Sequence, residues 1–262
     1  MEWALYNLGL LYADQGKLAE AEAMYIRALQ GYEEALGPKH TSTLSTVNNL
    51  GALYKDQGKL AEAEAMYIRA LQGCEEALGP KHTSTLDTVN NLGLLYADQG
   101  KLAEAEAMYI RALQGKEEAL GPKHISTLGT VNNLGLLYAD QGKLAEAEAM
   151  YSRALQGYEE ALGSTLLLSY LPALHSMFGF GDLLAAIGRE DTAKIMYTRA
   201  LGGYTTIQGP SSKWCKQLRD RLETLQATSL DPKDQEKAAE VEATKSRSLK
   251  RIIRKFKKLD TG

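Results

Sequence analysis

The chain has 262 residues, 44% of them hydrophobic, and a formal net charge of −3, a composition typical of a soluble globular protein. Its start, MEWALYNLGL, lacks the regions of a signal peptide, and its longest apolar stretch is too short to span a bilayer. With only two cysteines, Cys74 and Cys215, neither a disulfide framework nor a cysteine-based metal site is expected. We therefore expect a cytoplasmic protein, with a nuclear location as the alternative.

The sequence is built from near-copies of one 42-residue unit. Thr85–Ser126 differs from Thr43–Ser84 at only five positions, and Thr127–Gly163 differs from the matching part of Thr85–Ser126 at three. Met1–Ser42 is another copy, and a diverged fifth copy follows at an offset of 46 residues, with the four extra residues in Ser164–Leu171. The chain is a repeat array, so its function has to be sought on the surface that an array presents.

Each unit is predicted to form a helix, a turn and a second helix. In Thr43–Asp56, apolar residues recur at helical spacing, and Ser42 or Thr43 is expected to cap the helix. A second apolar stripe predicts a helix at Leu60–Leu78, which Gly79 and the following proline should end.

The order Leu50-Gly51, Tyr54, Ala63, Tyr67, Ala70 resembles the tetratricopeptide repeat. The 42-residue unit resembles the version found in kinesin light chains, and it is closer still to the near-identical arrays of fungal NOD-like (STAND) receptors. The resemblance implies an all-α, right-handed solenoid of about five helix pairs with a C-terminal capping helix. It also implies a concave groove lined by the first helix of each repeat.

The predicted domain organisation follows from the copies. The solenoid is expected over residues 1–226, with repeats at about 1–42, 43–84, 85–126, 127–163 and 164–210 and a capping helix at 211–226. Residues 227–262 are expected to form a linker and a basic amphipathic helix.

The differences between copies point to candidate binding residues. In the first helix, copies two to four vary at three positions, the second and third of which lie 7 and 10 residues after the first. At 100° per residue these positions fall within an arc of ~80°. The arc lies opposite Leu50 and Tyr54, away from the core, and the resemblance places it in the groove. The varying residues are Ser45, Asp87 and Gly129, then Ala52, Leu94 and Leu136, then Lys55, Ala97 and Ala139.

A ladder of asparagines, Asn48, Asn90 and Asn132, lies in the same arc and does not vary. Carboxamides both donate and accept hydrogen bonds, so the ladder is suited to holding the backbone of an extended peptide. In the alternative interpretation these residues only bridge adjacent helices and the variation is drift. A second ladder, Asn49, Asn91 and Asn133, lies nearer the helix contact, and both interpretations stay open for it.

The aspartates Asp14, Asp56, Asp98 and Asp140 recur at the end of the first helix. They are expected either to bond to the turn or the next helix, or to form a negative rail for a basic ligand. Kinesin light chains favour acidic peptides through basic groove residues, but only Lys55 could serve that role here, so that preference is not carried over.

No catalytic or metal-binding constellation is predicted. His40, His82 and His124 recur 42 residues apart, and stacked repeats lie ~8–10 Å apart, too far for imidazoles to share a zinc ion. The chain is expected to be no enzyme, and neither a cofactor nor a small-molecule substrate is expected.

Between Thr244 and Leu259 there are eight Lys/Arg and no acid, so an acidic body carries a basic tail. The predicted helix could pack its apolar stripe on the array, bind an anionic membrane or a calmodulin-like protein, or act as a nuclear address or polyanion contact. Its candidate contact residues are Lys250, Arg251, Arg254, Lys255, Lys257 and Lys258.

The leading prediction is a non-catalytic scaffold that binds a protein or peptide in the groove. One alternative is association with a membrane or polyanion through the tail. Another is a sensor fragment of a larger receptor, since Met1 opens directly in a first helix without a cap.

Overall fold

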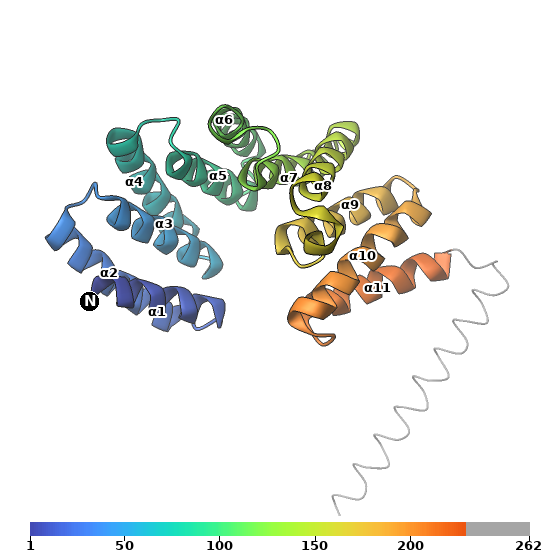
Figure 1. Cartoon of the computed structure of the whole chain (residues 1–262), viewed down its shortest axis with the longest axis horizontal. Coiled ribbons are helices and arrows are strands. Elements are labelled where there is room, and N and C mark those ends of the chain that lie inside the picture. The colour runs from blue at the N-terminus through green and yellow to red at the C-terminus, as the bar shows by residue number, and fades with distance from the viewer. Residues whose placement is uncertain (229–262) are drawn as a thin grey trace, which may run out of the picture. The chain divides into compact units, whose positions relative to one another are not determined.

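The computed structural model describes residues 1–228, and over this range all regular structure is α-helical. The predicted basic helix lies outside the described residues. No helix within residues 1–228 is both long and apolar enough to cross a membrane. The eleven described helices (Figure 1) are α1 (Glu2–Asp14), α2 (Leu18–Leu36), α3 (Thr41–Asp56), α4 (Leu60–Leu78), α5 (Thr83–Asp98), α6 (Leu102–Leu120), α7 (Ile125–Asp140), α8 (Leu144–Leu167), α9 (Leu171–Ala186), α10 (Glu190–Gln208) and α11 (Lys213–Thr228).

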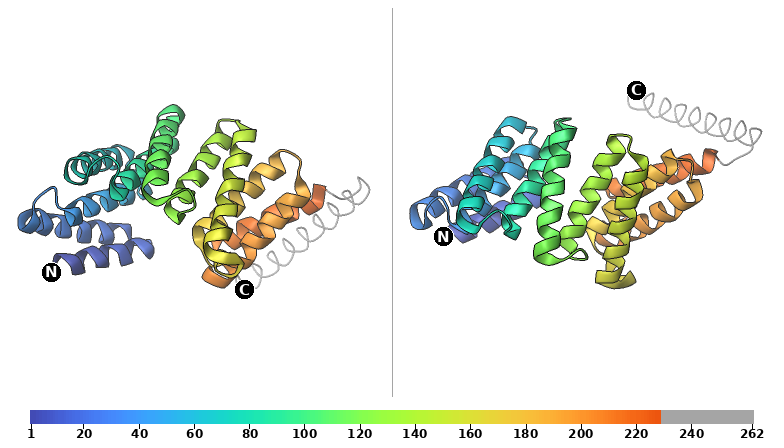
Figure 2. Two further views of the ribbon diagram at one scale, coloured as in Figure 1. Left: turned by 45° about the horizontal axis from the view of Figure 1, so that its top comes forward. Right: turned by 90° about the horizontal axis from the view of Figure 1, so that it is seen from above.

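The helices form two compact units, Met1–Leu167 and a second that begins at Leu168. In the first unit, α1 to α8 form four antiparallel pairs, and each pair packs on the next. The first helices α3, α5 and α7 lie along the inner side of the curve of this unit, and α4 and α6 lie along its outer side (Figure 1). In two further views the helices of this unit follow one another in chain order, from blue through green (Figure 2). The predicted all-α fold class is confirmed.

The turns of the array are set by glycines with positive φ at intervals of 21 residues. A residue with a Cβ is strained at such φ values, which is why glycine recurs there. Gly163 interrupts α8 in this way, so the second helix of the fourth repeat ends where the others end. The next such glycine is Gly188, 25 residues further, and Gly209 follows after 21. The four extra residues therefore fall after Gly163, as predicted.

The N-termini of α3, α5 and α7 are capped by the loop histidines. His40 Nδ1 accepts a hydrogen bond from the backbone N–H of Ser42 at 3.2 Å, and His82 and His124 repeat this contact. The prediction that Ser42 or Thr43 caps the helix was wrong, because the helix begins earlier and the imidazole already supplies the acceptor. The Thr43 hydroxyl instead donates to the carbonyl of Gly37 at 2.8 Å and ties the turn to the helix.

The same apolar cluster recurs between successive repeats of the first unit. Ala63 and Tyr67 of α4 pack with Leu92 and Leu95 of α5, and all four side chains are at most 2% exposed. Tyr67 also packs on α3 of its own repeat, and this requires glycine at position 51, because a Cβ there would lie 2.8 Å from a ring carbon of Tyr67. Matching clusters join α2 to α3 and α6 to α7.

A glutamate bound by a glutamine and a lysine of the next repeat, which we call the glutamate lock, also recurs at each of these contacts. Gln57 donates to Glu22 at 2.9 Å, and Lys59 pairs with the same carboxylate at 3.1 Å. The hydrogen bond from the Gln57 side-chain amide, and to a lesser extent the charge of Lys59, hold the pKa of Glu22 below its ordinary value. Equivalent contacts lower the pKa of two further glutamates; they join Gln99 and Lys101 to Glu64, and Gln141 and Lys143 to Glu106.

In the second unit, α9 and α10 form one pair and α11 packs on α10. Cys215 and Leu218 of α11 are fully buried. Trp214 stacks on Tyr204 of α10, with ring centroids 5.7 Å apart and an interplanar angle of 13°. The helix thus covers the apolar side of α10, the role expected of a capping helix.

Candidate functional site

The predicted groove residues lie on α3, α5 and α7, and their exposure changes along each helix. Ser45 and Asp87, near the N-terminal ends, are exposed. Ala52, Leu94 and Ala97, further along, are half-buried and pack against the clusters between repeats. Leu136 is 48% exposed. Only part of the predicted arc is therefore open for contact with a ligand.

The two asparagine ladders are hydrogen-bonded to each other. Asn91 Nδ2 donates to Asn48 Oδ1 at 3.2 Å, and Asn133 Nδ2 donates to Asn90 Oδ1 at the same distance. The Thr130 hydroxyl donates to Asn90 Oδ1 as well. The second ladder therefore bridges neighbouring first helices, and the first ladder supplies the accepting oxygens.

These contacts leave one side of the first ladder available. Within residues 1–228, no hydrogen bond is made by the Nδ2 of Asn48 or of Asn90. Both side chains are half-buried, and their oxygens are held by the neighbouring repeat. Each amide thus presents two N–H donors in a fixed orientation.

Asn132, the third member, is placed differently. Its Oδ1 is buried and has no hydrogen-bond partner among the described residues. The fifth copy carries Gly179 at the position of Asn91 and Asn133, so its sequence offers no amide to continue the pairing. The ladder is consequently complete only at Asn48 and Asn90.

A hollow of about 180 Å³ opens beside Asn48. Leu44 of α3 and Cys74 and Leu78 of α4 contribute to its lining, and Ser84 and Asp87 contribute from α5. A second hollow of about 200 Å³ is lined by Trp3 and Tyr32, among others. The two share Tyr6, Thr41 and Ser45, so they form one groove across the first repeats.

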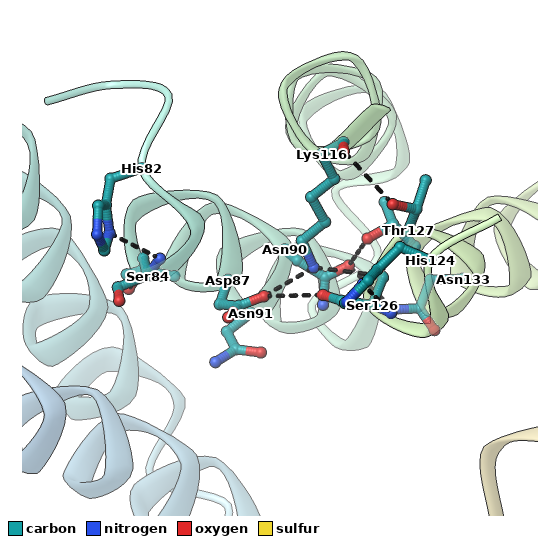
Figure 3. A network of polar contacts seen from close by, with 12 residues as sticks. His82, Ser84, Asp87, Asn90, Asn91, Lys116, His124, Ser126, Thr127 and Asn133 are labelled. Atoms are coloured by element: carbon teal, nitrogen blue, oxygen red, sulfur yellow. Dashed lines mark hydrogen bonds and ion pairs between the residues drawn. The ribbon is translucent and has the colours of Figure 1, made fainter. Parts of the chain in front are cut away.

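The groove includes a position on the second helices that was not predicted as part of it. Lys116 of α6 is 3% exposed and pairs with Asp87 of α5 at 2.7 Å (Figure 3). The same position holds Cys74 in the second repeat and Tyr158 in the fourth. Its variation between copies was visible in the sequence, but periodicity within one helix cannot show which helix it faces.

The charged residues of the groove pair with one another. Lys55 Nζ lies 3.5 Å from Asp98 and 3.6 Å from Asp56, so the one cation of the predicted arc is shared by two carboxylates. Burial raises the pKa of Asp140. The described contacts show Asp98 paired with Lys55 rather than bonded to its own turn, and a role for the aspartates in holding a basic ligand stays a prediction.

No metal site emerges from the described residues. Residues 1–228 contain no group of three or more His, Cys, Asp or Glu placed to hold a metal ion. The loop histidines act as helix caps. The predicted contacts of the basic tail, Lys250 to Lys258, lie outside the described part of the chain.

The profile of the tetratricopeptide repeat family matches residues 1–67, 42–118, 84–160 and 128–206. The chain belongs to this family. Tetratricopeptide repeat proteins are generally non-catalytic scaffolds that bind protein or peptide partners. No match is found among curated protein sequences.

Solved structures show the same fold at low sequence identity. BtubC (BKLC) from P. vanneervenii is 22% identical with a TM-score of 0.63, covering 87% of this chain and 81% of that one. A putative kinesin light chain from Podospora anserina with nearly identical TPR-like repeats is 20% identical with a TM-score of 0.59, covering 78% and 95%. Aspartyl phosphate phosphatase F from Bacillus subtilis is 15% identical with a TM-score of 0.68, covering 95% and 61%. The relation to NOD-like receptor arrays stays a prediction.

Proposed function

We propose that this chain is a non-catalytic scaffold that binds an extended peptide segment of a partner protein along α1, α3 and α5. The observation that carries the proposal is the pair of fixed amide donors at Asn48 and Asn90. An extended peptide presents carbonyl oxygens that such donors can bind. The adjoining hollows give room for its side chains.

Replacing each of these asparagines by aspartate gives a sharp test. Aspartate keeps an oxygen to accept from Asn91, Asn133 and Thr130, but it removes the two N–H donors. The full chain is used to select binders from a random peptide library displayed on phage, and dissociation constants of the selected peptides are then measured. We expect Asn48→Asp with Asn90→Asp to weaken binding at least about tenfold, the loss of one or two hydrogen bonds.

Two controls separate this effect from charge and from folding. Gln72→Glu adds a negative charge at an exposed position of α4 outside the groove, and it should leave affinity unchanged. The melting temperature of the double variant should stay close to that of the wild type. Unchanged affinity of the double variant would refute the groove.

A second candidate function rests on the basic tail. Its eight cations without an acid suit an anionic vesicle or a polyanion. Deletion of Thr244–Gly262 should abolish binding to vesicles that contain phosphatidylserine and leave peptide binding intact. Vesicle binding that survives the deletion excludes this candidate.

A further inference from the structure

Each repeat carries a pair of residues, 29 positions apart, that vary from copy to copy and face each other across its two helices. We call them the variable pair. In the third repeat the two are Asp87 and Lys116, 2.7 Å apart. In the fourth, a Cβ added to Gly129 would lie 3.7 Å from the hydroxyl of Tyr158. The full set is Trp3/Tyr32, Ser45/Cys74, Asp87/Lys116, Gly129/Tyr158 and, within the second unit, His175/Tyr204.

The members of a pair are matched to each other. A carboxylate faces an amine in the third repeat, and a residue without a side chain faces a large phenol ring in the fourth. In the second unit, the rings of His175 and Tyr204 are 5.8 Å apart. In these three pairs the side chain from the second helix is almost fully enclosed: Lys116 is 3% exposed, and Tyr158 and Tyr204 are 0% exposed. Tyr32 of the first repeat is half-buried.

The second repeat is the exception because both members of its pair are small. Cys74 is 4% exposed and forms part of the lining of the hollow of about 180 Å³. It occupies the position from which a lysine or tyrosine extends in the other repeats. Burial raises the pKa of the Cys74 thiol, so this part of the lining stays uncharged. Leu44 and Leu78 add apolar surface.

The chain itself shows which side chain suits this position. Tyrosine occupies it in the first, fourth and fifth copies. In the second unit an additional ring reaches the pair from the next helix: Trp214 stacks on Tyr204 and lies 5.0 Å from His175. Trp214 follows Gly209 by five residues, as Ser84 follows Gly79, and Ser84 lines the hollow of the second repeat.

We propose that the second repeat holds a subsite for one aromatic side chain, tyrosine, of the bound peptide. The ring takes the place that the chain's own tyrosines fill in other copies, against Cys74, Leu44 and Leu78. Asn49 also lines the hollow. Its Nδ2 donates to the Tyr6 hydroxyl at 2.9 Å, so its Oδ1 remains as the acceptor that we assign to a phenol hydroxyl. Cavities of comparable size in proteins bind benzene-sized molecules. The assignment of a peptide ligand rests on the proposed function, whereas the subsite itself does not.

The probe is p-cresol, the side chain of tyrosine, added to the full chain and followed by saturation-transfer NMR and titration of the protein's amide shifts. We expect one site, with shifts centred on Ser45, Cys74 and Thr88. Cys74→Tyr fills the hollow with the residue of the first and fourth copies, and it should weaken p-cresol binding by at least about tenfold. Toluene should bind more weakly than p-cresol because it lacks the hydroxyl.

A graft supplies the matched gain of function. Gly129→Ser with Tyr158→Cys rebuilds the pair of the second repeat in the fourth and leaves the second repeat untouched. This variant should bind two p-cresol molecules, and its folding is checked by circular dichroism. If Cys74→Tyr fails to fold, the graft still decides the question through its stoichiometry.

Two results would overturn the subsite: a folded Cys74→Tyr chain that keeps the wild-type affinity for p-cresol, or a folded graft with no second site. Both results differ from a failure of the peptide groove. If the groove fails, the selected peptides bind Asn48→Asp/Asn90→Asp as tightly as the wild type, while p-cresol still binds the second repeat.

Discussion

The second and third repeats differ at only five of 42 positions, yet they present different surfaces to the groove. They share the glycine turns, the histidine caps, the apolar cluster and the glutamate lock. In the third repeat Lys116 and Asp87 close the space between the two helices with an ion pair. In the second repeat Ser45 and Cys74 leave a hollow there. We call the shared features the frame. The frame is constant and carries a variable pair, and changes to the pair need not disturb the frame.

The largest effects should come from the frame, and they should be equal in the two repeats. Leu53 is 2% exposed and Leu95 is 0% exposed, and each packs in the cluster that joins its repeat to the one before. Leu53→Ala and Leu95→Ala should each destabilise the first unit by about 3 kcal/mol, the cost of a cavity in a packed core. Urea unfolding measures this, and a loss below about 1 kcal/mol in either variant would contradict a shared frame.

The next largest effect should come from the variable pair, whose substitution should lower stability more in the third repeat than in the second. Asp87→Ala leaves the buried Lys116 amine without its carboxylate, and because Asp87 is itself half-exposed the cost should be about 2 kcal/mol, less than for a fully buried pair. Ser45→Ala in the second repeat should change stability by less than about 0.5 kcal/mol. The double variant Asp87→Ser/Lys116→Cys should recover most of the loss. In the cycle formed by Asp87→Ser, Lys116→Cys and this double variant, additive effects would argue against a coupled pair.

Glycine-to-alanine substitutions test the difference between the frame and the variable pair through the space around each glycine. A Cβ on Gly93 would lie 2.8 Å from the ring of the buried Tyr109, so Gly93→Ala should cost about 1–2 kcal/mol through overpacking. Gly129 belongs to a variable pair, and the nearest atom to its Cβ would be 3.7 Å away. Gly129→Ala should therefore stabilise α7 by about 0.5 kcal/mol through helix propensity. Equal melting temperatures for the two variants would be inconsistent with this placement.

The glutamate lock predicts a shared dependence on acid pH. The amide of Gln99, followed by Lys101, holds the pKa of Glu64 below 4.5 in the folded chain. Its contribution is therefore fully present above pH 4.5 and is lost as the pH falls through the lowered folded value. Glu64→Gln should cost about 1 kcal/mol at pH 7, and the gap to the wild type should close on acidification. A gap that does not narrow at all as the pH falls from 5 toward the acid unfolding of the chain would exclude ionisation as the cause.

Much of the frame followed from the sequence. The predicted second helix, Leu60–Leu78, coincides with α4, because its apolar stripe and Gly79 mark both its face and its end. The start of α3 was less well predicted. The helix begins at Thr41 because His40 caps it, and histidine is not among the residues that usually signal a cap.

The groove was only partly predictable. Spacing at 100° per residue placed the asparagines on one face of the first helix. Which atom of each amide bonds to the neighbouring repeat depends on how successive repeats are stacked. Asn91 reaches Asn48 across 43 residues of chain, and no pattern within one helix contains that offset. The role of position 74 depends on how the two helices of a repeat cross, which also lies beyond periodicity.

The most direct test of this account exchanges the variable pair between repeats. Ser45→Asp with Cys74→Lys gives the second repeat the pair of the third, and peptides selected on the wild type are titrated against both chains. We predict that tyrosine-containing peptides lose at least about tenfold in affinity, while the melting temperature stays within a few degrees of the wild type. Unchanged affinity for the same peptides in the folded variant would contradict the claim that the variable pair decides what the groove binds.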